Sequence, residues 1–331
     1  MALTVVIFVA GALVSLSTSW LLVTRLERIG ERLGLSEALL GMVAALAADA
    51  PEITSSVSAL SQHQRTIGSG VIIGSNVFNL AALLGVGAIV AGSIAFHRRV
   101  VVLGGVVAMW IALCCVATVT EVLPVVAGLI LASVALIAYT IILGLRRSVL
   151  LRLPLPKIFG TWLSTAVDEE ELELEDAIHP ARGRPVDTLV AGAALIIVVL
   201  ASIAMEHSAS KLGHHFHIAD AVIGGLILAV VTSLPNAVAA VHLARGGRGA
   251  AALSTALSSN NLNVVVGLLI PGAIIGLAAP SLAQNLTVIT YLVLTACVLA
   301  LAYAYRRLDR RSGWMIVGAY IVFVVCLLAV V

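Results

Sequence analysis

Two acidic residues, Asp49 and Glu52, stand within an otherwise apolar stretch of the chain. They are three positions apart, so a helix places them on one face. Ionisable side chains inside an apolar span are costly to bury, which makes each a candidate functional group. Carboxylate oxygens bind hard cations such as Ca²⁺ and Na⁺, and two adjacent carboxylates repel, which allows a proton to take the place of a cation. The pair therefore predicts chemistry with a cation or a proton.

A proline between the two carboxylates frees backbone oxygen beside them. Pro51 carries no N–H, so the carbonyl of Ala47, four residues earlier, loses its helical partner. Further along, Ser75 and Asn79 are spaced i, i+4, and a helix presents their hydroxyl and amide oxygens on one face. Neutral oxygens around a pair of carboxylates suit one divalent cation or a few monovalent ones.

The same pattern occurs a second time, 184 positions later in the chain. Pro235 stands where Pro51 stands in the first copy, and the i, i+4 pair recurs. The oxygen-bearing side chains of the second copy are Thr232, Ser233, Asn236, Ser259 and Asn263. A duplicated polar motif interrupted by proline is typical of the binding site of a secondary transporter. For any one residue, the alternative is that Ser and Asn only bridge helices and that Pro only kinks them.

The composition excludes an ordinary soluble domain. Hydrophobic residues make up 61% of the 331 residues and charged residues only 11%, against about a quarter in soluble domains. Apolar stretches of about 20 residues, enough to cross a bilayer, follow one another along the chain. We predict ten membrane-spanning segments: 3–24, 36–62, 68–92, 100–118, 123–145, 187–205, 218–243, 250–275, 282–305 and 313–331.

The duplicated motif lies in the second and third of these segments and again in the seventh and eighth. An odd number of segments separates the copies, so they cross the membrane in opposite directions. The predicted fold is therefore an all-α integral membrane protein with ten transmembrane helices in two inverted five-helix repeats, and with helices 2 and 7 broken at the midplane. The predicted domains are residues 1–145 with the motif at 41–87, a connection at 146–186, and residues 187–331 with the motif at 225–271.

The basic residues predict the orientation of these segments. With the N-terminus outside, all but Arg65 and Lys211 of the 19 Lys and Arg residues fall in inner loops, in agreement with the positive-inside rule. We therefore predict a multi-pass protein of the plasma membrane with the connection 146–186 in the cytoplasm.

Polar segments outside the spans carry weaker signals. Residues 149–163 could lie along the membrane interface, and two prolines argue against one unbroken helix there. The acidic run 168–176 lacks the glycine and the ligand spacing of an EF-hand loop, so we expect a disordered, solvated segment. The segment 206–220 contains Glu206 and several histidines that could bind a transition metal or sense pH, but we expect a solvated, flexible loop.

Residues 74–79, Gly-Ser-Asn-Val-Phe-Asn, follow the Ala50-Pro51-Glu52 break, and together they resemble the repeats of the sodium/calcium exchanger family within the cation/Ca²⁺ antiporter superfamily. The resemblance implies a cation antiporter that works by alternating access, with helices 1 and 6 sliding past a core of the other spans. We accordingly predict exchange of Ca²⁺ against Na⁺. The resemblance also implies cation ligands at Glu52, Ser75, Asn79, Thr232, Ser233, Ser259 and the backbone around Ala47 and Ala48.

The second copy departs from the family pattern. The family usually carries a second Glu where Asn236 stands, often an Asp where Asn263 stands, and a hydroxyl where Asp49 stands. The charge is therefore gathered in the first copy, and we expect a lower affinity for Ca²⁺ because fewer anionic ligands surround it. The alternatives are a H⁺-coupled or monovalent-cation exchanger on the same scaffold, a cation-binding membrane protein without transport activity and, more remotely, an intramembrane enzyme.

Other classes of protein lack support in the sequence. It contains no Walker loop, zinc-protease histidine pair or nucleophile elbow, so we predict neither an enzyme nor an ATP-driven pump. The predicted partners are Ca²⁺ and Na⁺ (or H⁺) as substrates and the lipid bilayer, with no cofactor and no nucleic acid. The predicted cation ligands are Glu52, Asp49, Ser75, Asn79, Thr232, Ser233, Asn236, Ser259, Asn263, and the backbone of Ala47 and Ala48.

Overall fold

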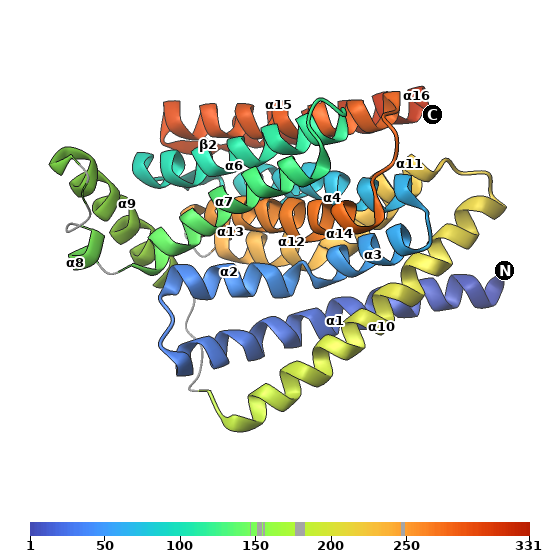
Figure 1. Ribbon diagram of the computed structural model, residues 1–331, viewed down its shortest axis with the longest axis horizontal. Coiled ribbons are helices and arrows are strands. Elements are labelled where there is room, and N and C mark those ends of the chain that lie inside the picture. Colours follow the sequence, from blue (N-terminus) through green and yellow to red (C-terminus); the bar gives the residue numbers. More distant parts are fainter. Residues whose placement is uncertain (146, 151–153, 155, 176–182, 246–248) are drawn as a thin grey trace.

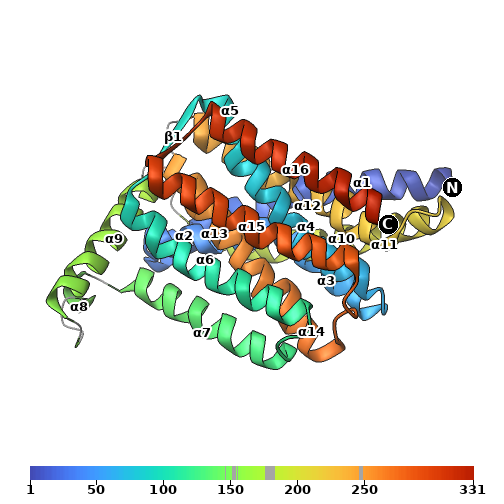
Figure 2. The same ribbon diagram turned by 90° about the horizontal axis from the view of Figure 1, so that it is seen from above.

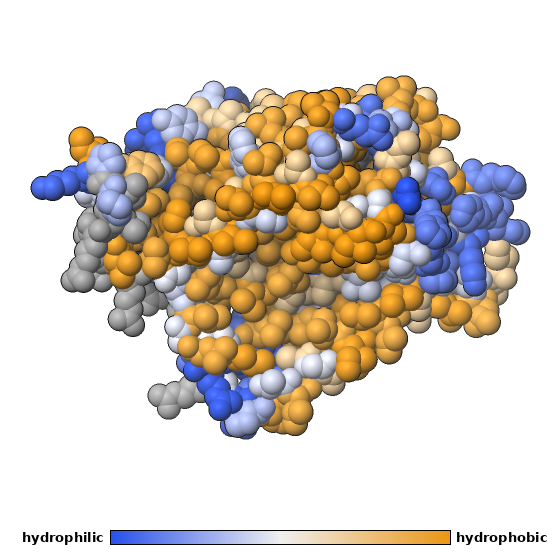
Figure 3. All heavy atoms as spheres, viewed as in Figure 1, coloured by the Kyte–Doolittle hydropathy of each residue, from blue (hydrophilic) through white to orange (hydrophobic). Residues whose placement is uncertain are grey.

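Apart from two short strands, the described chain is helical, and the helices form one elongated bundle (Figures 1 and 2). The computed structural model describes residues 1–331 with the exception of 146, 151–153, 155, 176–182 and 246–248. Polar side chains gather at the two ends of the bundle, and an apolar band lies between them (Figure 3).

The first part of the chain forms a series of helices with short connections. These are α1 (Ala2–Leu33), α2 (Glu37–Ala48), α3 (Ala50–Ser61), α4 (Arg65–Asn79), the π-helical segment η1 (Leu80–Val86), α5 (Gly87–Ala91), α6 (Arg98–Val119), α7 (Val125–Gly144), α8 (Arg147–Leu150) and α9 (Lys157–Glu175). Ser36 caps α2, because its hydroxyl accepts a hydrogen bond from the N–H of Leu39.

The second part repeats this succession of long and short helices. Its segments are α10 (Pro185–His215), α11 (Asp220–Val222), the π-helical η2 (Ile223–Leu228), α12 (Ala229–Arg245), α13 (Gly249–Leu262), the π-helical η3 (Asn263–Leu269), α14 (Ile270–Ile275), α15 (Leu282–Tyr305) and α16 (Arg310–Val330). Asp309 caps α16, and the hydrogen bond that it accepts from the N–H of Ser312 lowers the pKa of its carboxyl group.

Nine continuous helical stretches in the described residues are long and apolar enough to cross a membrane. Their surfaces carry many exposed apolar side chains, such as Leu13, Ile137 and Val322. A surface of this kind suits contact with lipid tails and not with water. The chain is therefore a multi-pass membrane protein.

The predicted segment 36–62 is not among the nine because its helix is interrupted. α2 ends at Ala48 and α3 begins at Ala50, and Asp49 between them has backbone angles φ −80° and ψ −2°. The interruption follows from Pro51, which removes a helical hydrogen bond and disfavours the helical conformation of the preceding turn. The predicted break in this segment is confirmed.

The corresponding break predicted near Pro235 is wrong, because α12 continues through this residue. A proline within a membrane helix removes one backbone hydrogen bond, and neighbouring groups can compensate for it. The irregular backbone of this region lies earlier, in the π-helical η2, which leads directly into α12.

α1 and α10 lie side by side along one face of the bundle (Figure 1). They contain 32 and 31 residues, which at 1.5 Å per residue gives lengths of about 48 and 46 Å. Small residues bring them close together: Ser15 and Ser202 share a hydrogen bond of 2.8 Å, and a Cβ on Gly11 would lie 3.0 Å from the carbonyl oxygen of Ala201.

The flexible loop that we predicted for 206–220 is wrong over its first ten residues. Residues 206–215 continue α10, and the side chain of Glu206 is fully buried. It is held by Ser58 of α3 and by Gln62, which caps the C-terminus of α3, and both side chains donate hydrogen bonds to it. The segment is therefore ordered by packing against a polar face, which its composition alone did not indicate.

The acidic run is helical as well, which corrects the prediction of disorder. Residues 168–175 belong to α9, whereas Asp176 lies outside the described residues. Glu170 is buried and accepts hydrogen bonds from Tyr139 at 3.0 Å and Ser254 at 2.5 Å. These donors from the bundle offset the repulsion between like charges. α8 ends at Leu150 before α9 begins at Lys157, in agreement with the prediction of a broken helix.

The two ends of the bundle differ in their charged residues. We call the end that carries α9 the arginine end, and its arginines include Arg25, Arg28, Arg98, Arg99 and Arg307. Arg25 forms an ion pair of 2.7 Å there with Asp187, which joins α1 to α10. Strands β1 (Ser93–Ala95) and β2 (Arg307–Asp309) pair antiparallel at the same end. Both termini lie at the opposite end, which we call the histidine end after His63 and His207 (Figure 1).

Candidate cation-binding site

Asp49 and Glu52 lie at the interruption between α2 and α3, in the interior of the bundle. Both residues have 0% of their surface exposed. The interruption places Asp49 at the junction and Glu52 in the first turn of α3. Among the described residues no group of three or more His, Cys, Asp and Glu side chains is placed to hold a metal. Any cation bound here is therefore held by this one carboxylate pair together with neutral oxygens.

α12 faces the two carboxylates and supplies hydrogen-bond donors to both. The Nδ2 of Asn236 donates to the Oδ1 of Asp49 at 2.7 Å, and the hydroxyl of Ser233 donates to the Oε1 of Glu52 at 2.9 Å. The earlier acidic residue pairs with the later residue of α12, so the two segments run antiparallel. Because Ser233 and Asn236 follow Asp49 and Glu52 by 184 positions, these two contacts are related to each other by the repeat.

The helix α13 also bonds to Asp49, and α4 reaches it through α13. The hydroxyl of Ser259 donates to the Oδ1 of Asp49 at 2.6 Å. The Nδ2 of Asn79 in turn donates to the hydroxyl oxygen of Ser259 at 3.2 Å. All three residues are fully buried. The hydrogen-bond chain therefore connects Asn79 to the acidic pair through Ser259.

Four buried asparagines form a network that obeys the offset of the repeat. The Nδ2 of Asn76 donates to the carbonyl of Asn260 at 3.1 Å, and the Nδ2 of Asn260 donates to the carbonyl of Asn76 at 3.1 Å. The Nδ2 of Asn79 donates to the Oδ1 of Asn260 at 3.2 Å, and Asn263 makes the corresponding bond to Asn76 at 3.2 Å. Each contact thus has a partner contact in which the two repeats exchange roles, as in an interface with a two-fold axis.

The backbones of the two repeats touch directly beside this network. A Cβ on Gly74 would overlap the carbonyl oxygen of Gly225, so only glycine permits this crossing of α4 with η2. The π-helical segments fall at equivalent places: η1 begins directly after Asn79, and η3 begins at Asn263. π-Helical turns are frequent at functional sites, since they shift side chains relative to a regular helix.

Two of the four predicted hydroxyl ligands, Ser75 and Thr232, form hydrogen bonds with backbone carbonyls and not with the carboxylates. The hydroxyl of Ser75 donates to the carbonyl of Ala229 at 3.3 Å, and that of Thr232 donates to the carbonyl of Leu228 at 2.9 Å. Both side chains are buried. Their hydroxyl oxygens keep lone pairs that could bind a cation.

The carbonyl oxygens of Ala47 and Ala48, next to the interruption, accept a hydrogen bond from α1. The hydroxyl of Ser19 is 3.2 Å from the oxygen of Ala47 and 3.4 Å from that of Ala48. Ser19 is fully buried, so this contact is the direct link between α1 and the interruption. Ser19 was not among the predicted ligands; the signal available in the sequence was its i, i+4 spacing with Ser15.

Several oxygens of the cluster are buried without a hydrogen-bond partner among the described residues. They are the Oδ2 of Asp49, the Oε2 of Glu52, the Oδ1 of Asn79 and the Oδ1 of Asn263. Leaving buried polar atoms unpaired costs about 1–3 kcal/mol each. Carboxylate and amide oxygens are ligands that Ca²⁺ and Na⁺ prefer, so a hard cation would remove this cost. Asn76 and Asn260 were not among the predicted ligands; their side chains accept hydrogen bonds from Asn263 and Asn79 and hold them in place.

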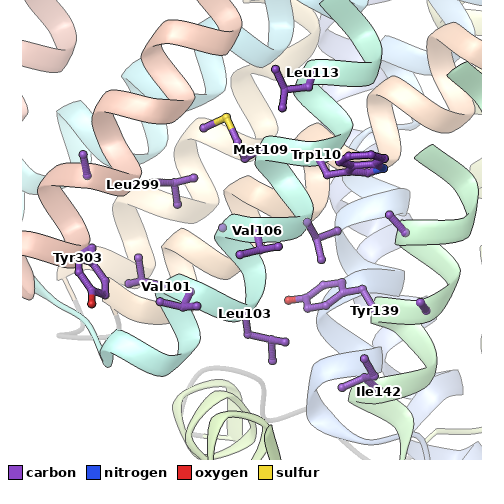
Figure 4. A pocket seen from close by; sticks show the side chains of 16 residues that line it. Val101, Leu103, Val106, Met109, Trp110, Leu113, Tyr139, Ile142, Leu299 and Tyr303 are labelled. Atoms are coloured by element: carbon purple, nitrogen blue, oxygen red, sulfur yellow. The ribbon is translucent and has the colours of Figure 1, made fainter. Parts of the chain in front are cut away.

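Two hollows in the surface of the described bundle have none of these residues in their walls, and the smaller one is lined by Phe78 and Ala237, the sequence neighbours of Asn79 and Asn236. One hollow of about 720 Å³ lies between α6, α7 and α15 (Figure 4). Its apolar wall includes Val106, Trp110, Leu113, Leu299 and Tyr303. It contains none of the predicted ligands, and the carboxylate pair is fully buried. The site is closed to solvent in this conformation.

Comparison with known sequences agrees with the resemblance found in the motif. The family described as "Sodium/calcium exchanger protein" matches residues 3–146 and 187–329. The inner membrane protein YrbG of Escherichia coli (strain K12) is 26% identical over 331 residues, which cover 99% of this chain and 97% of that protein. Sodium/potassium/calcium exchanger 2 of Gallus gallus is 27% identical over 188 residues, 54% of this chain, and the match spans only 27% of that longer protein.

Solved structures show the same arrangement of helices. The crystal structure of the H⁺/Ca²⁺ exchanger CAX superposes with a TM-score of 0.72 at 13% identity, over 97% of this chain and 82% of that chain. The sodium-calcium exchanger NCX_Mj, soaked with 100 mM Na⁺ and 10 mM Sr²⁺, superposes with a TM-score of 0.61 at 21% identity, over 98% of both chains. At these identities the likeness establishes the fold.

Proposed function

Because the chain belongs to the sodium/calcium exchanger protein family, we propose that it is a secondary active cation antiporter that exchanges Ca²⁺ against Na⁺. The observation that carries the proposal is the closed cluster around Asp49 and Glu52, with buried oxygens that lack hydrogen-bond partners in the described structure. Such oxygens are stabilised by a hard cation. The transported ions are the substrates, and the proposal includes no resident cofactor.

In this proposal the charged ligands are Asp49 and Glu52, and the remaining ligands are neutral. Asn236 has a particular role, because its Nδ2 now donates to Asp49, and rotation of its amide would turn its oxygen to a bound cation. The same applies to Ser233 and Ser259, whose hydroxyls now donate to Glu52 and Asp49. The remaining proposed ligands are Ser75, Asn79, Thr232, Asn263 and the carbonyls of Ala47 and Ala48.

The proposal includes two inverted five-helix repeats, residues 1–145 and 187–331, joined by the connection 146–186. The interrupted α2–α3 then supplies a tenth crossing beside the nine continuous helices. The reciprocal hydrogen bonds of Asn76 and Asn260 support a two-fold relation between the repeats. The excess of arginine at one end of the bundle supports a plasma-membrane orientation with that end in the cytoplasm and the histidine end outside.

For alternating access we propose that α1 and α10 move together as one pair. The ion pair of Arg25 with Asp187 and the hydrogen bond of Ser15 with Ser202 hold the two helices together. The asparagine network and the contact of Gly74 with Gly225 join α4, η2, α13 and η3 into a core. Sliding of the pair past this core would open the closed site to one side at a time.

Coupling to H⁺ in place of Na⁺ is the second candidate, favoured by one specific observation. Asp49 and Glu52 are bonded to neutral donors, and in the described structure no Lys or Arg side chain forms an ion pair with them. Two close carboxylates without a cationic neighbour can share protons, as coupled pairs do. A proton on this pair would balance its charge when Ca²⁺ leaves.

Uptake of ⁴⁵Ca²⁺ into proteoliposomes tests both candidates. Vesicles are given an outward Na⁺ gradient or an outward H⁺ gradient, with the wild-type protein and with Glu52→Gln, which keeps the shape of the side chain and removes its charge. Uptake driven by Na⁺ and abolished by the substitution supports Na⁺/Ca²⁺ exchange. Uptake driven by H⁺ alone supports the second candidate. No uptake under either gradient contradicts both and directs the search to other cations.

A further inference from the structure

Glu206 of α10 is a third buried carboxylate in the bundle, and the mechanism above does not use it. Its residue surface is 0% exposed. The hydroxyl of Ser58 donates to its Oε2 at 2.6 Å, and the Nε2 of Gln62 donates to the same oxygen at 2.9 Å. Its Oε1 is buried without a hydrogen-bond partner among the described residues.

This carboxylate lacks a permanent counter-charge. Within the described residues, the basic group that reaches it is His207, whose Nδ1 is 3.5 Å from its Oε2 and is charged only when protonated. Two neutral donors bond to Oε2, and Oε1 has no hydrogen-bond partner among the described residues. Burying an ionised carboxylate with so few partners is strongly unfavourable. By contrast, Asp187 at the other end of the same helix has Arg25 at 2.7 Å. The surroundings of Glu206 therefore contain no permanent positive charge among the described residues, and a bound cation can supply one.

A row of polar side chains on α3 connects Glu206 with the central carboxylates. Glu52, Ser55 and Ser58 follow one another at spacings of three on the helix, and Gln62, four residues further, caps its C-terminus. Ser55 is fully buried, and its hydroxyl has no hydrogen-bond partner in the described structure. Ser58 lies six residues beyond Glu52, which is about 9 Å along the helix axis in the direction of the histidine end.

We propose that Glu206, Ser58, Gln62 and Ser55 form a second cation site, through which ions pass between the central pair and the histidine end of the bundle. One carboxylate with hydroxyl and amide oxygens suits a hard, partly hydrated cation, which is held weakly because a single charge opposes it. The exposed side of the site is formed by His207, whose side chain is 45% exposed. This proposal rests on the proposed transport function in one respect only, which is that the cation is Ca²⁺ or Na⁺.

The position of the site also gives it a mechanical consequence. Glu206 belongs to the pair α1–α10, whereas Ser58 belongs to α3 and Gln62 caps that helix. If the pair slides, the carboxylate separates from both donors, and a cation at this place compensates for their loss. Occupancy of the second site therefore lowers the free energy of the conformation in which α10 has moved away from α3.

The site is tested by cation binding in a protein whose central site has been removed. Purified Asp49→Asn/Glu52→Gln protein in detergent is titrated with Mn²⁺, a hard divalent cation whose free form is counted by electron paramagnetic resonance. The same titration is made after the additional substitution Glu206→Gln, and with Glu206→Asp, which keeps the charge. The proteins with and without Glu206→Gln both retain α9 and all other acidic groups, so the difference in their Mn²⁺ binding reports on Glu206 alone. Asp187→Asn is the matched control on the same helix.

We expect Glu206→Gln to remove one weak Mn²⁺ site, or to weaken it about tenfold or more, as substitutions around metal ligands do. Glu206→Asp should retain most of the binding, and Asp187→Asn should leave it unchanged. Identical binding with Glu206 and with Gln at this position overturns the proposal. So does an infrared C=O band of a protonated carboxyl group at neutral pH that disappears in Glu206→Gln, because a permanent proton would then supply the missing charge.

A flux measurement adds the functional consequence. In proteoliposomes, Glu206→Gln should raise the apparent KM for Ca²⁺ on the histidine side about tenfold with a largely preserved maximal rate, whereas loss of the central pair abolishes the rate. A Glu206→Gln protein with unchanged KM contradicts the passage of ions through this site. If no Ca²⁺ flux is found for the wild-type protein, the proposed function fails, and the Mn²⁺ titration still decides on the second site.

Discussion

The two halves of the central site use corresponding positions for opposite chemistry. Asp49 and Glu52 of the first half accept hydrogen bonds, and their counterparts Ser233 and Asn236, 184 positions later, donate them. The backbone differs as well, since the first half is interrupted at Asp49 and α12 runs on through Pro235. A two-fold scaffold can therefore gather all of its charge in one half, provided that the other half supplies donors that stabilise this charge when no cation is bound.

The largest effect is expected when the charged half is made like the neutral one. In Asp49→Asn/Glu52→Gln, we expect the affinity for Ca²⁺ to fall more than about a hundredfold, since each carboxylate attracts a nearby cation by several kcal/mol. Without Ca²⁺ the variant should be at least as stable as the wild type, because unpaired buried charges are removed. The dependence of Tm on Ca²⁺ concentration measures both quantities. A variant that keeps the Ca²⁺-dependent rise in Tm would place the cation elsewhere.

The reverse change makes the neutral half resemble the charged one. Asn236→Asp adds a third carboxylate at the site, so we expect Ca²⁺ affinity to rise about tenfold and stability without Ca²⁺ to fall, because like charges then repel. Calorimetric or Tm titration with CaCl₂ measures both. Gln284→Glu is the matched control, since it converts a buried amide that is bonded to Ser69, away from the carboxylates. An equal gain in affinity in the control would show that added charge, and not its position, is responsible.

A smaller effect tests whether the two-fold relation holds where the halves are chemically alike. Asn76→Ala and Asn260→Ala each remove one of two equivalent bonds of 3.1 Å, so both should destabilise the protein to a similar extent, by about 1–3 kcal/mol. The double substitution should lower the free energy of unfolding by less than the sum of the two single effects, because each variant disturbs the same contact. Thermal unfolding of the wild type, the two single variants and the double variant completes this double-mutant cycle. Strongly unequal single effects would contradict the symmetric network.

The smallest expected effect concerns the contact of α1 with the interruption. Ser19→Ala removes the hydrogen bond to the carbonyls of Ala47 and Ala48 and should lower stability by about 0.5–1.5 kcal/mol. Ser17→Ala is the matched control on the same helix, because Ser17 is exposed and bonds only within α1. Ca²⁺ uptake should change in Ser19→Ala and remain unchanged in Ser17→Ala. Equal behaviour of the two would show that α1 does not act on the site through Ser19.

Much of the fold and of the central site could be predicted from the sequence. The length of the apolar stretches indicated the membrane spans, and the predicted span 282–305 coincides with α15. The carboxylates were recognisable because charge is rare in apolar segments, and the proline between them indicated the interruption. The structure brings Asp49, Glu52, Ser233, Asn236 and Ser259 into one hydrogen-bonded cluster.

What could not be predicted depends on contacts between distant segments. Pro235 occupies the position in the second copy that Pro51 occupies in the first, yet α12 is continuous, because groups on neighbouring helices can compensate for the lost backbone hydrogen bond. Glu206 and Glu170 stood in segments whose composition is typical of solvated loops. Their order follows from donors on other helices, Ser58 for Glu206 and Tyr139 for Glu170, and no local pattern contains these pairings.

The asparagine network also has a consequence for the time course of synthesis. Asn76 has its bonding partners, Asn260 and Asn263, in the other half of the chain, and the separation to Asn260 is 184 residues. At about 5–20 residues per second, the ribosome needs roughly 10–40 s to add that many residues. During this interval the first five helices hold unsatisfied amides inside the membrane. A nascent chain that stalls in the second half would therefore expose the polar face of α4, a mark by which membrane quality control can distinguish it from a finished protein.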